Sequence, residues 1–271
     1  MGSITRIHHL DGATMCPIAT GHHEMVAHVL AIETDASGIV LVDTGIGDEA
    51  RRDPVQWLGR PFVATVRPDR SHRGSVLSQL RALGLDPRDV THILVTHLDL
   101  DHAGGLADFP SARVHVHLEE LAAALSPSWR ERSRYRDIQW AHGPRWSTYQ
   151  RTGEEWYGFP AVHALDGLPP EILAIPLPGH TRGHSAIAVE GADGWLLHCG
   201  DAYFDASSVR PDVPVASPMV ARFEQLVAVD RDRVADNHRR LAELAALSER
   251  PVALFSAHDP RELAAFASAS A

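Results

Sequence analysis

The chain has 271 residues, of which 44% are hydrophobic and 22% charged, so it can bury a sizeable core in one domain. Its 35 acidic residues outnumber 25 basic ones, and the net charge of −10 argues against nucleic acid as a partner, because phosphate backbones bind basic surfaces. Two cysteines are too few for a disulfide scaffold. Residues 1–10 carry no export signal, and no apolar run is long enough to cross a bilayer. We therefore expect a cytoplasmic protein without a membrane partner.

Hydrophobic patterning predicts strands and helices in alternation along the first half of the chain. Leucines at helical spacing precede Gly84, a typical residue at the end of a helix. The expected elements in chain order are strands at 25–33 and 38–42, a glycine-bearing loop at 43–47, a connection rich in proline and arginine at 57–73, a helix at 75–83, strands at 91–96 and 112–117, and a helix at 119–125.

The second half continues in the same manner. Short runs of aliphatic residues predict strands, and longer amphipathic runs predict helices. The expected elements are strands at 171–177, 185–190 and 195–198, helices at 222–229 and 231–247, and a strand at 252–256. This interspersed order is typical of a layered α/β architecture.

The segment at about 126–166 differs in composition. It holds Trp129, Trp140, Trp146 and Trp156, four of the six tryptophans, and three of the four tyrosines. Because it shows little strand periodicity, we interpret it as an aromatic-rich insertion on the scaffold. Aromatic rings line many apolar ligand sites, so it could form a lid or pocket wall, or alternatively a homodimer interface.

The strand at 91–96 runs directly into a cluster of polar side chains. Within six residues the chain places His97, Asp99, Asp101 and His102. Alternate residues of an extended chain share a face, so the first three can point the same way and a turn can bring His102 around. Imidazoles and carboxylates converging on one spot favour divalent transition metals between them. The alternative is a polar loop in which these groups bond to one another.

Three later residues strengthen the metal interpretation. His180 lies in a glycine-flanked loop between strands, Asp201 follows the strand at 195–198, and His258 follows the last strand. Strand ends are where α/β folds build their sites.

With these residues in this order, the chain resembles the metallo-β-lactamase superfamily over nearly its whole length. The pattern of that family is His-x-His-x-Asp-His, followed by a loop histidine, a bridging aspartate and a C-terminal histidine. The resemblance implies a four-layer αββα sandwich formed by residues 1–271 as one domain. Residues 41–45 resemble the family's early strand-loop element, whose aspartate, here Asp43, supports the metal loop from behind the ligands. Two divalent ions are then implied, one bound by His97, Asp99 and His180, the other by Asp101, His102 and His258, with Asp201 between them.

One residue departs from the family pattern, because Asp99 stands where the family has its second motif histidine. Zinc is the metal we expect, but a carboxylate at this place also suits iron or manganese. Alternatively, Asp99 does not bind metal and one site stays weak.

By resemblance the protein is a dinuclear hydrolase of a small ester or lactone that uses a metal-bridging hydroxide, with Asp101 also able to carry a proton. Tyr203, shortly after Asp201, occupies roughly the place where related acyl-homoserine lactonases have a tyrosine against the substrate carbonyl, although the spacing is shorter by a residue. A packed tyrosine with its hydroxyl satisfied is the alternative. Two other functions stay open: hydrolysis of phosphoesters or phosphotriesters, and a non-hydrolytic di-iron or metal-sensing role.

Overall fold

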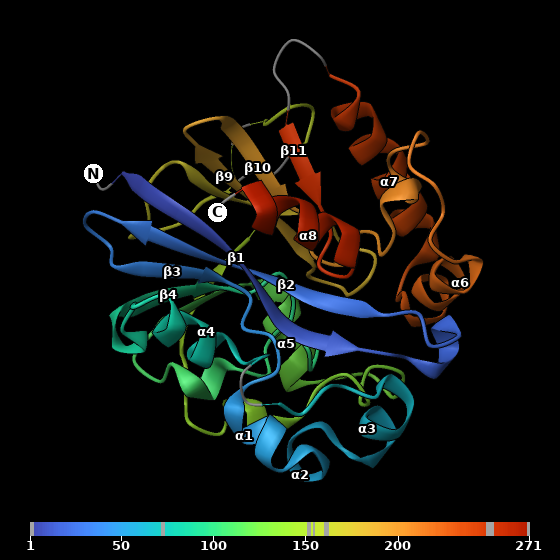
Figure 1. The fold of residues 1–271 in the computed structure, drawn as a ribbon, viewed down its shortest axis with the longest axis horizontal. Helices are drawn as coiled ribbons and strands as arrows, with labels where there is room; N and C mark the ends of the chain where they lie inside the picture. Colours follow the sequence, from blue (N-terminus) through green and yellow to red (C-terminus); the bar gives the residue numbers. More distant parts are fainter. Residues whose placement is uncertain are drawn as a thin grey trace.

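The computed structural model describes residues 3–71, 74–150, 153, 155–159, 163–247 and 252–269. Two sheets face each other, and helices cover their outer sides (Figure 1). The first sheet contains, in spatial order, β1 (Ile4–Met15), β2 (Met25–Thr34), β3 (Ile39–Val42), β4 (Val90–Leu94), β5 (Arg113–His117) and β6 (Arg145–Tyr149). The second contains β11 (Val252–Phe255), β10 (Gly194–His198), β9 (Ser185–Gly191), β8 (Ile172–Pro176) and β7 (His163–Ala164).

Eight α-helices are present in the described part of the chain, and those from the first half gather below the first sheet in Figure 1. They are α1 (Asp48–Arg52), α2 (Pro54–Leu58), α3 (Arg60–Val66), α4 (Val76–Ala82), α5 (Leu118–Leu125), α6 (Pro218–Val227), α7 (Arg231–Ala245) and α8 (Pro260–Ala269).

Three layers of hydrophobic contacts hold these elements together. Between the sheets, Leu30 and Ile32 of β2 pack with Ile187 and Phe255. Side chains of the first sheet pack against Leu80 of α4 and Ala123 of α5, and those of the second against Leu241 and Leu244 of α7. Each fully buried Leu, Ile or Phe side chain contributes roughly 1.5–3 kcal/mol. The predicted four-layer αββα sandwich is confirmed.

Strand β2 illustrates how the sequence produces this layering. Successive side chains of a strand point to opposite faces. Leu30 and Ile32 accordingly face the second sheet, while Val29 and Ala31 belong to the core beneath the helices. A strand buried on both faces is expected to be largely hydrophobic, which explains why residues 25–32 are apolar apart from the buried His28.

The parallel parts of both sheets position the polar loops. Strands β3, β4, β5 and β6 run parallel, as do β10 and β11. Parallel strands end at the same edge of a sheet, so the loops that follow them meet there.

The sequence prediction did not include α1, β7 or α8, and it was incomplete or wrong in two longer segments. The connection expected at 57–73 contains the end of α2 and all of α3, with residues 72–73 outside the described range. Within the 126–166 segment, Arg145–Tyr149 form β6, which pairs in parallel with β5 and which the sequence analysis did not predict. Residues 151–152, 154 and 160–162 of that segment lie outside the described residues.

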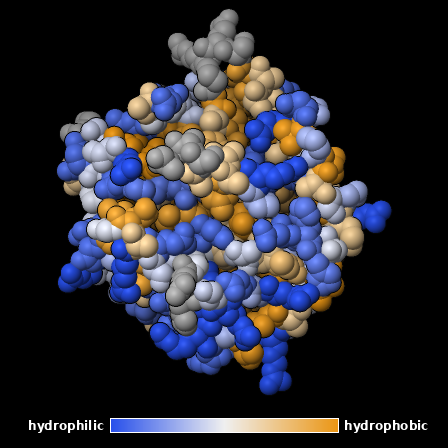
Figure 2. All heavy atoms as spheres, viewed as in Figure 1, coloured by the Kyte–Doolittle hydropathy of each residue, from blue (hydrophilic) through white to orange (hydrophobic). Residues whose placement is uncertain are grey.

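The exterior has the mixed character of a solvent-exposed surface. On the face shown in Figure 2, hydrophilic residues are interspersed with small hydrophobic groups. No helix in the described ranges has both the length and the apolar character needed to cross a bilayer. Cys16 and Cys199 are both free thiols.

Candidate metal centre

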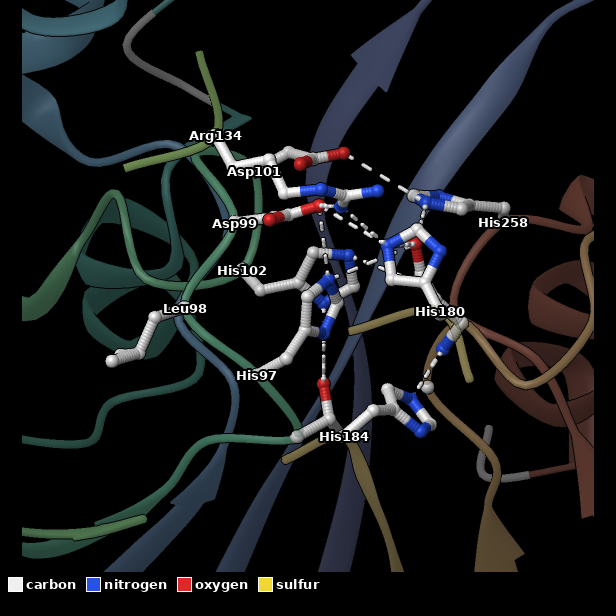
Figure 3. Close-up of polar contacts among 12 residues, drawn as sticks. His97, Leu98, Asp99, Asp101, His102, Arg134, His180, His184 and His258 are labelled. Carbon is white, nitrogen blue, oxygen red and sulfur yellow. Dashed lines mark hydrogen bonds and ion pairs between the residues drawn. The ribbon is translucent and has the colours of Figure 1, made fainter. Parts of the chain in front are cut away.

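The seven side chains predicted as ligands meet at one edge of the sandwich, in loops that follow four strands. The loop after β4 brings four of them, and the loops after β8, β10 and β11 bring one each. The six of them that Figure 3 labels converge with their rings and carboxylates, whereas the side chain of Leu98, in the same loop, points away from them. The seven are His97, Asp99, Asp101, His102, His180, Asp201 and His258.

A first donor group consists of His97, His180 and Asp201. The Oδ2 atom of Asp201 lies 3.2 Å from His180 Nε2 and 3.8 Å from His97 Nε2. Asp99 adds a fourth donor, because its Oδ2 lies 3.1 Å from His180 Nε2 and 3.5 Å from His97 Nε2.

A second donor group consists of Asp101, His102 and His258. Here His258 Nε2 lies 3.8 Å from Asp101 Oδ2. Asp201 contacts this group as well, with Oδ1 3.1 Å from His102 Nε2 and Oδ2 3.1 Å from His258 Nε2. One carboxylate therefore lies between both donor groups.

The donor separations fit bound divalent metal. A tetrahedral ion with bonds of about 2.0–2.1 Å separates its ligand atoms by about 3.3–3.4 Å, close to the distances above. In addition, His97 Nε2, His102 Nε2 and Asp201 Oδ1 are buried and make no hydrogen bond of good geometry among the described residues, although the last two lie 3.1 Å apart. Buried polar atoms of this kind normally have a partner. A nitrogen and oxygen donor set around such atoms suits Zn²⁺, Fe²⁺ or Mn²⁺.

Hydrogen bonds behind the imidazoles set their orientation. Asp43 Oδ2 accepts from His102 Nδ1 at 2.8 Å, and the Val26 carbonyl accepts from His258 Nδ1 at 2.7 Å. In the neutral imidazole, each bond places the proton on Nδ1 and leaves the Nε2 lone pair facing the centre. Asp43 also accepts from the Thr96 amide and hydroxyl, at 2.7 and 2.8 Å, which agrees with the supporting role expected for this residue.

His184 supports Asp201 in a comparable way. Its Nδ1 donates to the Leu177 carbonyl at 3.0 Å, and its Nε2 accepts from the Asp201 amide at 2.9 Å. The chain approaches so closely here that a Cβ on Gly200 would lie 2.5 Å from His184 Nε2, and Gly200 has a φ of +54°. Glycine is the residue that tolerates both conditions.

The charges of the centre are strongly coupled. Burial disfavours the carboxylate of Asp201, but His258, His102, His180 and His97 outweigh burial and hold its pKa well below the usual range. Conversely, burial disfavours a charged His102, yet Asp201, Asp43 and Asp101 raise its pKa well above the usual range. The carboxylates thus create a local potential that favours positive charge.

Asp99 has a further partner that the sequence analysis did not identify. Arg134, from the 126–166 segment, donates from Nη1 to Asp99 Oδ2. The same nitrogen lies 3.1 Å from His180 Nε2, and Figure 3 shows the guanidinium between the two side chains. Burial disfavours the Asp99 carboxylate, but Arg134 and His97 outweigh burial and hold its pKa well below the usual range.

The structure does not bring Tyr203 to the centre. Its side chain is fully buried, and its hydroxyl donates to Glu262 Oε1 at 3.1 Å. Phe204 faces the centre instead, with its ring centroid 4.7 Å from that of His258. The assignment of Tyr203 to the substrate carbonyl is corrected accordingly, because its buried hydroxyl bonds to Glu262 while the next residue, Phe204, packs against His258.

A buried carboxylate that the sequence analysis missed connects the parts of the site. Glu120, in the first turn of α5, accepts from the Leu98 amide at 3.0 Å, the Gly183 amide at 3.1 Å and the Tyr135 hydroxyl at 3.1 Å. It therefore joins the loop after β4, the loop after β8 and the 126–166 segment. Sequence alone marks it only as an acidic residue near a helix N-terminus.

We expect Glu120→Ala to lower the free energy of unfolding by about 2–3 kcal/mol, because it leaves two buried amides without an acceptor. Urea unfolding followed by circular dichroism measures the change. The neighbouring Glu119 is exposed, so Glu119→Ala is the matched control and is expected to change stability by less than about 0.5 kcal/mol. Equal stabilities of the two variants would contradict the role assigned to Glu120.

Five of the donor residues line a cleft of about 1430 Å³: Asp99, Asp101, His180, Asp201 and His258. Hydrophobic side chains on its walls come from distant parts of the chain, among them Met15, Phe62, Trp129, Phe204, Phe223 and Leu226. Part of the 126–166 segment thus forms a wall, as one of the two sequence interpretations proposed.

Comparisons with known proteins agree with this geometry. The model of the metallo-beta-lactamase superfamily matches residues 25–240. A probable metallo-hydrolase of Mycobacterium tuberculosis is 40% identical over 263 residues, covering 96% of this chain and 82% of its own. An N-acyl homoserine lactonase of Azorhizobium caulinodans is 28% identical over 231 residues, covering 84% of this chain and 80% of its own.

Solved structures show the same fold. An N-acyl homoserine lactone hydrolase, with the product N-hexanoyl-L-homoserine bound at its catalytic metal centre, matches with a TM-score of 0.73 at 19% identity, over 97% of this chain and 96% of that one. The family match, the 40% identical relative and the shared fold lead to one conclusion. The chain belongs to the metallo-beta-lactamase superfamily and is a metal-dependent hydrolase of that family.

Proposed function

We propose that the protein hydrolyses a small ester or lactone with two divalent metal ions, one at each donor group. The observation that carries this proposal is the position of Asp201, whose two carboxylate oxygens contact histidines of both groups. When bound, such ions supply a nucleophile at neutral pH, since they lower the pKa of water to about 7, and they polarise the substrate carbonyl.

The protein's own residues have distinct tasks in this proposal. Asp201 holds the two groups at a constant separation, and His184 holds Asp201. Asp101 lies in the cleft, where its side chain is 13% exposed, so its carboxylate can take a proton from the nucleophile and pass it to the leaving alkoxide.

The cleft supports a substrate with an apolar part. Its exposed hydrophobic wall includes Trp129 and Leu226, which are 77% and 67% exposed. An acyl chain placed there would remove this surface from water at about 25 cal/mol per Å². The acyl-homoserine lactonases among the relatives are named for substrates of this kind.

A substrate panel tests the proposal, with metal content measured on the same sample. The protein is expressed with zinc, iron and manganese supplied, and lactones of increasing acyl length, aryl esters and phosphotriesters are compared. We expect close to two ions per chain, and kcat/KM highest for a lactone or carboxylic ester. Turnover of phosphotriesters alone would contradict the substrate class, and protein without metal would contradict the centre.

A further inference from the structure

Arg134 competes for the atoms that would bind metal in the first donor group. Its Nη1 donates to Asp99 Oδ2, the oxygen that faces both His97 Nε2 and His180 Nε2. The same nitrogen lies 3.1 Å from His180 Nε2. An ion in this group must share the Asp99 oxygen with the guanidinium and displace the guanidinium from the His180 nitrogen.

The two donor groups also differ in charge because of Arg134. In the first group, the positive guanidinium compensates the carboxylate of Asp99. In the second group, Asp101 has its one ion pair among the described residues with His258. Asp201 is shared by both groups and does not distinguish them. The second group is therefore the more negative, and a divalent cation is more stable there.

Arg134 is held where it lies. Its side chain is only 12% exposed, and the adjacent Tyr135 is anchored to the buried carboxylate of Glu120 at 3.1 Å. Three residues earlier, Glu131 pairs with Arg182 of the loop after β8 at 2.8 Å. Contacts on both sides of Arg134 therefore fix this stretch of backbone beside the centre, with Arg134 at the wall of the cleft.

We propose that Arg134 is a positioning residue that weakens metal binding at the first donor group, so that the chain fills its second group first and binds two ions with unequal affinities. The inference rests on the proposed dinuclear centre. It assigns a function to Asp99, the residue that departs from the family motif. Through Asp99, an arginine from a different segment of the chain changes the metal affinity of the first donor group.

Metal titration in the absence of substrate tests this inference. Metal-free protein is titrated with Zn²⁺ against a chromogenic chelator, which gives a dissociation constant for each equivalent. Arg134→Met is expected to tighten the weaker constant by about 10-fold or more, the scale of changes behind metal ligands, and to leave the tighter one within about 3-fold. Arg134→Lys, which keeps a cation, is expected to retain a weak first group.

Arg130→Met is the matched control. Arg130 also lines the cleft, but its guanidinium lies over the Trp129 ring, 5.4 Å from the centroid. Neither constant is expected to change. In an Asp99→Asn background, where no carboxylate offsets the guanidinium, Arg134→Met is still expected to tighten the weaker constant, because it removes a cation that lies 3.1 Å from His180 Nε2.

The possible failures are distinguishable. Two equal constants in the unaltered protein, or no tightening in Arg134→Met, would overturn the inference and leave the dinuclear centre standing. Weaker binding in Arg134→Met would overturn it too, since Arg134 would then orient Asp99 toward the metal. Absence of metal binding in every variant would overturn the proposed centre itself.

Discussion

Replacing Asp201 with alanine is expected to reduce kcat/KM for ester hydrolysis by at least about 10³-fold, equivalent to about 4 kcal/mol of transition-state stabilisation. Its carboxylate lies within 3.8 Å of Nε2 atoms from His97, His102, His180 and His258. Without it, the four imidazoles keep only Asp99 and Asp101 as neighbouring ligand carboxylates, and both donor groups lose the partner that they share. Steady-state kinetics on the best substrate of the panel measures the loss.

Two companion variants separate chemistry from folding. Asp201→Asn keeps the shape of the side chain and removes its charge, and we expect it to lose activity almost as fully while its circular dichroism spectrum stays unchanged. Tyr203→Phe alters a buried neighbour whose hydroxyl bonds to Glu262, and it is expected to keep kcat/KM within about 3-fold. Near-normal hydrolysis by Asp201→Ala would reject the proposed mechanism.

Adding one methyl group at Gly183 is expected to destabilise the fold by more than about 3 kcal/mol, and to lower the melting temperature by roughly 10 °C. A Cβ built on Gly183 would lie 2.2 Å from the Glu120 backbone nitrogen and 2.7 Å from its Cα. These are backbone atoms of α5, so no side-chain rotation relieves the clash. The loop after β8 must then move away from the helix.

Because that loop carries His180, Gly183→Ala is also expected to weaken metal binding at the first donor group more than at the second. Gly191→Ala is the matched control: its φ is ordinary, and the nearest atom to an added Cβ, Ile7 Cδ1, lies at 3.5 Å. Thermal unfolding and the zinc titration compare the two variants. Identical melting curves would contradict the close packing of the loop against α5.

The candidate ligands were easiest to predict where they stand together in one short motif. The four candidate ligands between His97 and His102 follow a buried strand, and three later ones follow strands whose apolar runs are easy to recognise. Strand ends of parallel sheets meet in space, so sequence order and strand identity together predicted which side chains the structure brings together.

The sequence was least informative where contacts depend on distant segments. Arg134 and Glu120 stand in no motif, and their partners lie 35 residues away at Asp99 and 63 residues away at Gly183. Proline misled the interpretation of residues 57–73, because Pro61 lies in the first turn of α3, where the missing amide hydrogen costs nothing. Tyr203 and Phe204 differ by one position, and only tertiary packing decides which of them faces the cleft.

The place of His258 in the chain has a consequence for biosynthesis. Its Nε2 lies 3.1 Å from Asp201 and is brought there by β11, which pairs with β10 more than 50 residues after that strand has been made. A growing polypeptide emerges from the ribosome in order, so the second donor group stays incomplete until residue 258 has been released. Zinc or iron that enters the second group would therefore bind a molecule in which β11 has already been made, whereas the residues of the first group are all present once residue 201 has been released.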